Sequence, residues 1–289
     1  MVYGLIKKCQ MIHAEQAPLF EQERSNARVS GVFRPKLGSE ELGFSKNPGG
    51  ALTSRSILLY QANRLFSIYQ KEGLEKPPRY YVIEENRLGI PTLSSREKTC
   101  AYLKQEYGFS DKFPIFKALY ELHKIHDEED KTLSLFLLAW SRDALLRHGT
   151  LELLKTNTNE ILKPYLILDI LQKETENRYR ESIIEKITQN WMASWTQSGH
   201  LTGRSNKIRA QVKAGPVALA FACLLSTLSG ETGEKIFSSV WTQILDLNPQ
   251  QARELAQKAK EIGLLDIYSM GGVTQISFPS IREIFPGKL

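Results

Sequence analysis

The stretch 190–213 reads NWMASWTQSGHLTGRSNKIRAQVK and joins two different patterns. Trp191 and Trp195 lie four residues apart, which places both rings on one face of a helix. After Gly199 come four basic residues and no acidic residue. We therefore expect an amphipathic helix that leads directly into a short, positively charged hairpin.

The helix is predicted from about Arg180 to Ser198, and Gly199 is a typical residue for its end. Its apolar stripe consists of Ile183, Ile184, Ile187, Trp191 and Trp195. Large aromatic side chains on such a stripe usually pack in a core, so we expect both tryptophans to be buried. Residues 201–213 are predicted to form a β-hairpin whose basic side chains either face solvent or contact phosphates.

A second unit of the same kind is expected downstream. Residues 216–230, PVALAFACLLSTLSG, are apolar on every side of a helix, which indicates a buried central helix. GEKIFSSVWTQILDL is predicted as one helix, Asn248 as the cap of the next, and Gly263 as its end. LLDIYSMGGVTQISF alternates around Gly271 and Gly272 and predicts a hairpin. Helix, helix and hairpin in this order are typical of a winged helix.

The first half of the chain predicts helices of another arrangement. Residues 1–50 show no sustained period and are expected to form an irregular arm. An amphipathic helix is predicted from Ser54. After a turn at Gly89 and Pro91, Ser94 or Ser95 is expected to cap a second helix that ends near Tyr107. This pair is a helix-turn-helix candidate, and residues 113–171 then repeat apolar positions at the spacing of a helical bundle.

Composition sets wider limits. The chain has 289 residues, 42% of them apolar, and a formal net charge of +6. This length is enough for about two domains. With the patterns above, it suggests an arm at 1–50, a helical domain at 51–175 and a winged-helix-like region at 176–289. No apolar run is long enough to cross a bilayer, and the start MVYGLIKKCQ lacks the apolar core of a secretory signal. We expect a cytoplasmic protein with no membrane partner.

Signals for catalysis are sparse. Cys9, Cys100 and Cys223 form no paired motif, so they are expected to be buried thiols. His123 and His126 precede the acidic run at 127–130, which is either a solvated loop or a metal site. His200 is either a general base or a partner of helix-terminal carbonyls. No nucleotide-binding or hydrolase motif occurs, so we expect no catalytic residue, no metal and no cofactor.

Four blocks of the sequence carry a resemblance to a known family. They are LLYQANRLFSIYQ, EENRLGIPTLSSREKTCAYLKQEY, FKALYELHKIHDEEDKTLSLFLLAWSRDALLRHGTLELL and YRESIIEKITQNWMASWTQSGHLTG. Their order resembles the BrxA family of bacterial BREX phage-defence systems over residues 57–214, about half of the chain. The resemblance implies a helical fold with winged-helix character that binds double-stranded DNA without catalysis. The first 50 residues and the unit after Gly230 lie outside it.

The sequence therefore predicts a mainly α protein, a helical bundle with helix-turn-helix and winged-helix units and small hairpins. Its expected function is non-enzymatic binding of double-stranded DNA as an accessory protein of a phage-defence system. The alternatives are an interaction module for other proteins of a defence complex and a metal-dependent nuclease. The expected phosphate contacts are Arg204, Lys207, Arg209 and Lys213 in the hairpin, with Ser94, Ser95, Arg96 and Lys98 at a helix start.

Overall fold

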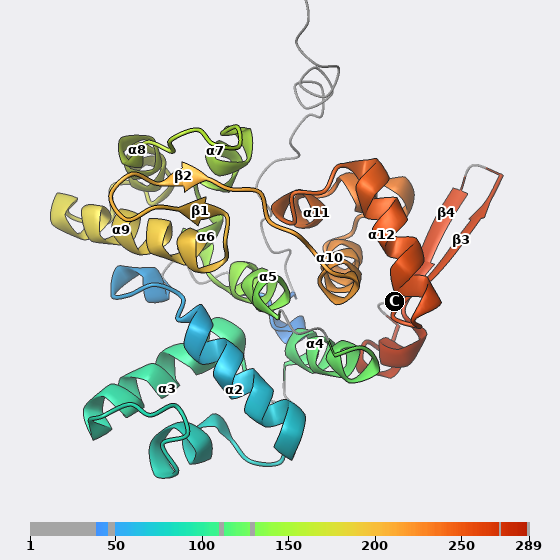
Figure 1. The fold of residues 1–289 in the computed structure, drawn as a ribbon, viewed down its shortest axis with the longest axis horizontal. Coiled ribbons are helices and arrows are strands. Elements are labelled where there is room, and N and C mark those ends of the chain that lie inside the picture. Colours follow the sequence, from blue (N-terminus) through green and yellow to red (C-terminus); the bar gives the residue numbers. More distant parts are fainter. Residues whose placement is uncertain (1–38, 46–49, 110–112, 128–130, 272, 288–289) are drawn as a thin grey trace, which may run out of the picture. The chain divides into compact units, whose positions relative to one another are not determined.

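Helices account for most of the chain in a computed structural model that describes residues 39–45, 50–109, 113–127, 131–271 and 273–287 (Figure 1). All of these residues belong to one structural unit, Gly31–Leu289. Two small antiparallel sheets of two strands each complete it. The predicted mainly α fold is confirmed. In the described ranges, no helix is both long and apolar enough to span a bilayer.

The first half contains the predicted helices with one shifted cap. Its elements are α2 (Leu59–Glu72), α3 (Leu93–Tyr107), α4 (Pro114–Ile125), α5 (Thr132–Arg142), α6 (Ala144–Arg147), α7 (Thr150–Lys155), a π-helical turn (Tyr80–Glu84) and 3-10 helices (Ser39–Leu42 and Ala51–Thr53). Thr92, and neither Ser94 nor Ser95, caps α3. Its backbone is extended and its hydroxyl accepts a bond from the Ser95 amide at 3.2 Å.

The second half contains the predicted hairpins. Its elements are α8 (Pro164–Glu174), α9 (Glu181–Gln197), β1 (Leu201–Thr202), β2 (Ile208–Arg209), α10 (Pro216–Leu228), α11 (Val240–Ile244), α12 (Pro249–Glu261), β3 (Asp266–Met270), β4 (Val273–Ser277) and 3-10 helices (Gly233–Ser238 and Pro279–Ile284). The Asn248 cap is confirmed: its side chain accepts from the Gln251 amide, and the Gln251 side chain accepts from the Asn248 amide.

One predicted helix is divided in two. The segment GEKIFSSVWTQILDL forms a 3-10 helix and then α11, separated by extended backbone at Ser239. The Thr242 hydroxyl donates to the carbonyls of Phe237 and Ser239 at 3.0 and 2.9 Å. Such side-chain bonds compete with helical hydrogen bonding, which explains the break. Apolar spacing alone does not reveal this competition, so it predicts one continuous helix.

Helix α10 lies at the centre of the C-terminal half, as its sequence predicted. Every residue from 217 to 226 is buried. The helix packs against α4 and α5 on one side and against α11 and α12 on the other, as Figure 1 shows. A helix without a polar face requires such cover on all sides.

Both tryptophans of α9 are fully buried, which confirms the core prediction. The indole N–H of Trp191 donates to the carbonyls of Leu146 and His148 at 3.1 and 2.8 Å. The ring of Trp195 meets Phe136 edge-on at 4.6 Å between centroids. Ile183, by contrast, was expected in the same stripe but is exposed, because the first turn of α9 faces solvent.

Contacts cross the domain boundaries suggested by the sequence. The backbone N–H of Ile57 donates to the Ser194 hydroxyl at 3.2 Å, and Ile161 forms a β-bridge with Ile208. Residues 39–45 were expected in an irregular arm, yet Leu42 and Phe44 are buried in the core. The described part of the chain therefore belongs to one folded unit. Residues 1–38 lie outside the described residues, as does Cys9.

Candidate nucleic-acid interface

The first hairpin has a tight loop between very short strands. Leu201 pairs with Arg209 and Thr202 with Ile208, in antiparallel register. Gly203 has a φ of +88°, and a Cβ atom there would lie 2.2 Å from the carbonyl oxygen of Asn206. Only glycine fits this position. The loop from 203 to 207 is consequently held in one tight conformation at the end of the strands.

A third segment extends this sheet. The Asn159 amide donates to the carbonyl of Arg209, the Arg209 amide to the carbonyl of Glu160, and the Leu162 amide to the carbonyl of Lys207, each at 2.8 Å. Strand β2 is therefore hydrogen-bonded on both sides. The sequence does not predict this segment, because TNTNEILK lacks the alternation of a strand and its pairing depends on residues more than forty positions away.

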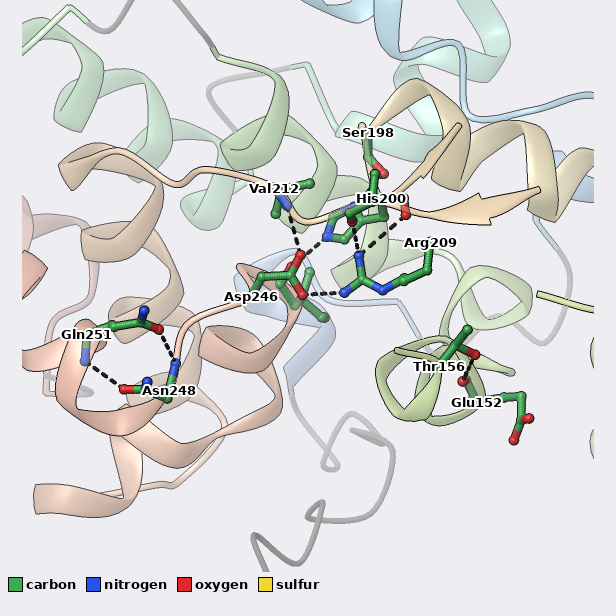
Figure 2. A network of polar contacts seen from close by, with 11 residues as sticks. Glu152, Thr156, Ser198, His200, Arg209, Val212, Asp246, Asn248 and Gln251 are labelled. Carbon is green, nitrogen blue, oxygen red and sulfur yellow. Dashed lines mark hydrogen bonds and ion pairs between the residues drawn. The ribbon is translucent and has the colours of Figure 1, made fainter. Parts of the chain in front are cut away.

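Arg209 is the one predicted phosphate contact that the structure turns inward. Its side chain is 5% exposed and forms an ion pair with Asp246, while the guanidinium also donates to the carbonyls of His200 and Ala210 (Figure 2). The other oxygen of Asp246 accepts from the Val212 amide at 2.9 Å. The expectation of an unneutralised charge is wrong at Arg209, because the carboxylate comes from the turn that follows α11.

His200 is buried beside this ion pair. When Nε2 carries the proton, it donates to the carbonyl of Ile244 at 2.6 Å, and Nδ1 accepts from the Ser198 hydroxyl at 2.7 Å (Figure 2). Burial lowers the pKa of His200 to about 4, which keeps the ring neutral near pH 7. The carbonyl lies at the end of α11 and not of its own helix. Because the ring is buried and both of its nitrogens are hydrogen-bonded within the protein, it is part of the core and is not accessible to a substrate.

The other cations of the hairpin stay at the surface. Arg204 and Lys213 are exposed. Lys207 is half-buried, and its ammonium donates to the carbonyl of Gly203 at 2.7 Å across the loop. Since that acceptor is neutral, the positive charge of Lys207 is retained. Three of the four predicted hairpin contacts are thus available to a polyanion.

Further exposed cations lie near the start of α9, outside the phosphate contacts predicted from the sequence. They are Arg178, Arg180 and Lys186. Glu181 and Glu185 lie among them, so this surface carries both signs of charge. The segment NRYRESIIEK contains these three basic residues, but the acidic residues between them hide a net charge in the sequence.

The start of α3 is less open to phosphate than expected. The Ser95 amide is already bonded to Thr92, as described above, and Arg96 is half-buried with its guanidinium donating to the carbonyl of Ile83 at 2.9 Å. Ser94 and Lys98 are exposed. Helix α3 packs on α2 and α5, whereas the hairpin packs on α9 and on residues 159–162, so the two predicted sets belong to different parts of the fold.

The possible metal site at 123–130 is only partly described. His123 is buried, and its Nε2 lies 3.0 Å from the Ser134 hydroxyl. Asp127 pairs instead with Lys131 at 3.1 Å and accepts from Gln70. Residues 128–130 lie outside the described residues. Within the described ranges, no group of three or more His, Cys, Asp or Glu side chains is arranged to hold a metal ion. Cys100 and Cys223 are buried free thiols, as predicted.

Comparison of the chain with models of protein families, with curated proteins and with solved structures gives no match. The resemblance to the BrxA family consequently rests on the sequence blocks alone.

Proposed function

We propose that this chain binds double-stranded DNA without a catalytic step, as an accessory protein of a BREX-like phage-defence system. The observation that carries the proposal is the order α7, residues 159–162, α8, α9, β1, loop and β2, with residues 159–162 paired to β2. A winged-helix domain has this order, in which the last helix enters the major groove and the loop of the hairpin contacts the backbone.

Helix α9, and not α3, is the groove-reading helix in this proposal. It lies against α8 (Figure 1), and the buried rings of Trp191 and Trp195 anchor its C-terminal half. Its other half is exposed at Lys186 and Gln189. Lysine donates to the acceptors of guanine, and glutamine bonds in two places to adenine, so these side chains suit contacts with base edges.

Affinity would come from phosphate contacts. Arg204 and Lys207 lie in the loop of the hairpin, Lys213 follows β2, and Arg178 and Arg180 precede α9. Each phosphate that a cation neutralises releases counterions, which makes such binding strongly dependent on salt. Arg209 is not among these phosphate contacts, because its ion pair with Asp246 fixes the base of the hairpin. Ser94 and Lys98 stay candidates for a separate contact.

The test is the salt dependence of duplex binding by the purified chain. The triple variant Arg204→Ala, Lys207→Ala, Lys213→Ala is expected to fold normally and to flatten the slope of log affinity against log salt by about two to three units. A matched control removes the same charge elsewhere, with exposed Lys104, Lys117 and Lys235 changed to Ala. The control should keep the wild-type slope. An unchanged slope in the folded hairpin variant would contradict the proposal.

A second candidate function is docking to another protein of the same complex. It is favoured by the apolar tip of the β3–β4 hairpin, where Met270 is 87% and Val273 71% exposed. Exposed apolar groups gathered at one place are typical of contact surfaces. This candidate gains if Met270→Ser with Val273→Ser abolishes assembly with a co-expressed defence protein but leaves duplex binding intact. It loses if assembly is unaffected.

The metal-dependent nuclease alternative is tested directly. Because His123 is directed into the core, we expect no cleavage of duplex DNA and no hydrolysis of ATP by the purified chain with Mg²⁺ or Mn²⁺. A cleavage activity that the variant His123→Ala, His126→Ala removes without unfolding would overturn this expectation.

A further inference from the structure

A second polar surface lies on α2, away from the hairpin. A groove of about 720 Å³ is bordered by Tyr60, Asn63, Arg64 and Lys71 of α2, by Arg87 and by the first residue of α5. Sites for small ligands usually have volumes of this order. The proposed DNA contact gives this groove no role.

Two cations of the groove have no acidic partner among the described residues. The guanidinium of Arg64 donates to the carbonyls of Leu88 and Arg87, both at 3.0 Å. These neutral acceptors fix the side chain but leave its charge uncompensated. Lys71 lies seven residues, or two helical turns, further along the same face and is exposed. Arg64 and Lys71 therefore form a positive edge along one side of the groove.

Arg87 differs from these two. It pairs with Glu72 at 2.8 Å and with Glu85 at 3.2 Å, so its charge is balanced within the protein. An anion in the groove would be held mainly by Arg64 and Lys71. Arg87 is therefore a structural part of the groove, whereas Arg64 and Lys71 have positive charge available for a ligand.

An aromatic ring stands at the end of this positive edge. Tyr60 is 67% exposed although it is a large aromatic residue on a packed helix. The guanidinium carbon of Arg64 lies 6.0 Å from the centroid of its ring. The amide nitrogen of Asn63 donates to Thr132 at 3.1 Å, which directs one polar side chain of the groove and leaves its amide oxygen as an acceptor. An exposed ring with a fixed guanidinium beside it, and an exposed lysine further along the same groove, suits the binding of a base and its phosphate.

We propose that the α2 groove binds a nucleotide, with the base stacked on Tyr60 and the phosphate held by Arg64 and Lys71. The nucleotide is either free or one unit of a single-stranded nucleic acid, since both present the same base and phosphate. This site does not depend on the proposed duplex contact, because it uses none of the residues of the hairpin or of α9.

The experiment measures binding of AMP by calorimetry and of fluorescent single-stranded (dT)10 by anisotropy. Tyr60→Ala should weaken binding about tenfold, as expected when a stacking ring is removed. Lys71→Ala should weaken binding and flatten the salt slope for (dT)10 by about 0.7. Matched controls are Tyr268→Ala, whose ring is 58% exposed and has Lys260 at 5.3 Å, and Lys104→Ala. Both controls should bind like the wild type.

The outcomes separate the possible ligands. Binding of AMP and (dT)10 indicates a site for single nucleotides, and binding of (dT)10 alone indicates a strand; either supports the proposal if Tyr60→Ala weakens it. Inorganic phosphate that competes as well as AMP, or an oligoglutamate peptide whose binding needs Lys71 but not Tyr60, would overturn it. So would failure of the folded chain to bind either probe. The hairpin triple variant should keep the wild-type affinity for AMP, so failure here is distinct from failure of duplex binding.

Discussion

The two hairpins of this protein are stabilised in different ways. Strands β3 and β4 pair over five residues each and carry an apolar tip at Met270 and Val273. Strands β1 and β2 pair over two residues each, and their loop carries the basic residues. So short a ladder is not stable alone. The first hairpin depends on residues 159–162 and on Asp246, which makes its loop a rigid extension of the core.

The ion pairs of the two hairpins show the same contrast. The side chains of Arg209 and Asp246 are 5% and 7% exposed, whereas those of Arg253 and Glu234 beside the second hairpin are 50% and 46% exposed. Exposed pairs contribute little to stability, but removing one partner of a buried pair leaves an uncompensated charge. The first hairpin should therefore be far more sensitive to single substitutions than the second.

The largest expected effect is at the helix that supports the first hairpin. Trp191→Ala should lower the free energy of unfolding by about 3 to 5 kcal/mol, because it leaves a cavity and deprives the carbonyls of Leu146 and His148 of a donor. Chemical denaturation measures the loss, and DNA binding should fail through unfolding. If the variant were as stable as the wild type but did not bind DNA, Trp191 would be a contact residue and the proposed role of the α9 stripe would be wrong.

A loss of about 3 kcal/mol is expected for Asp246→Ala, since Arg209 is left buried without its carboxylate. The value should fall at the lower end for a broken buried pair, because the carbonyls of His200 and Ala210 still accept from the guanidinium. Arg253→Ala breaks the exposed pair and should cost less than about 1 kcal/mol in the same denaturation series. Equal losses in the two variants would remove the contrast between the hairpins.

An effect smaller than the loss expected for Asp246→Ala depends on pH. The pKa of His200 is lowered to about 4 by burial, below the ordinary value of 6.5 for histidine. The unfolded chain then binds more protons between these values, so the stability present above pH 6.5 is lost as the pH falls toward 4. Between pH 7 and pH 5 this group accounts for about 2 kcal/mol. His200→Gln should reduce the measured acid loss by that amount, although the buried ring of His123 adds a similar loss of its own. An identical pH profile would exclude His200 as a source.

The sequence predicted most of the helices, the buried tryptophans and both hairpins because each follows from local spacing and from glycine positions, but it did not predict the break at Ser239. It did not predict the inward turn of Arg209. Arg204 and Arg209 look alike in the sequence, and they differ only because Asp246, a residue 37 positions further along, approaches one of them. The direction of a charged side chain on a two-residue strand is set by tertiary contacts, which no local pattern contains.

The same limit applies to the candidate sites. Residues 159–162 have no strand pattern in the sequence, and their pairing to β2 exists only in the folded chain. The groove on α2 is formed by a helix face, the turn at 86–88 and the start of α5, which are separated in sequence. Tyr60 and Arg64 were visible as residues of an amphipathic helix, but the concavity beside them was not.

The position of α10 has a consequence for how the chain is made on the ribosome. The helices α4 and α5 that cover one side of it are synthesised earlier, whereas α11 and α12 on its other side emerge later. Because residues 217–226 become buried only when both sides are present, an apolar surface is exposed on a nascent chain in which α10 has left the ribosome but α11 and α12 have not. The burial of this core is therefore completed only after α11 and α12 have been synthesised, late in translation.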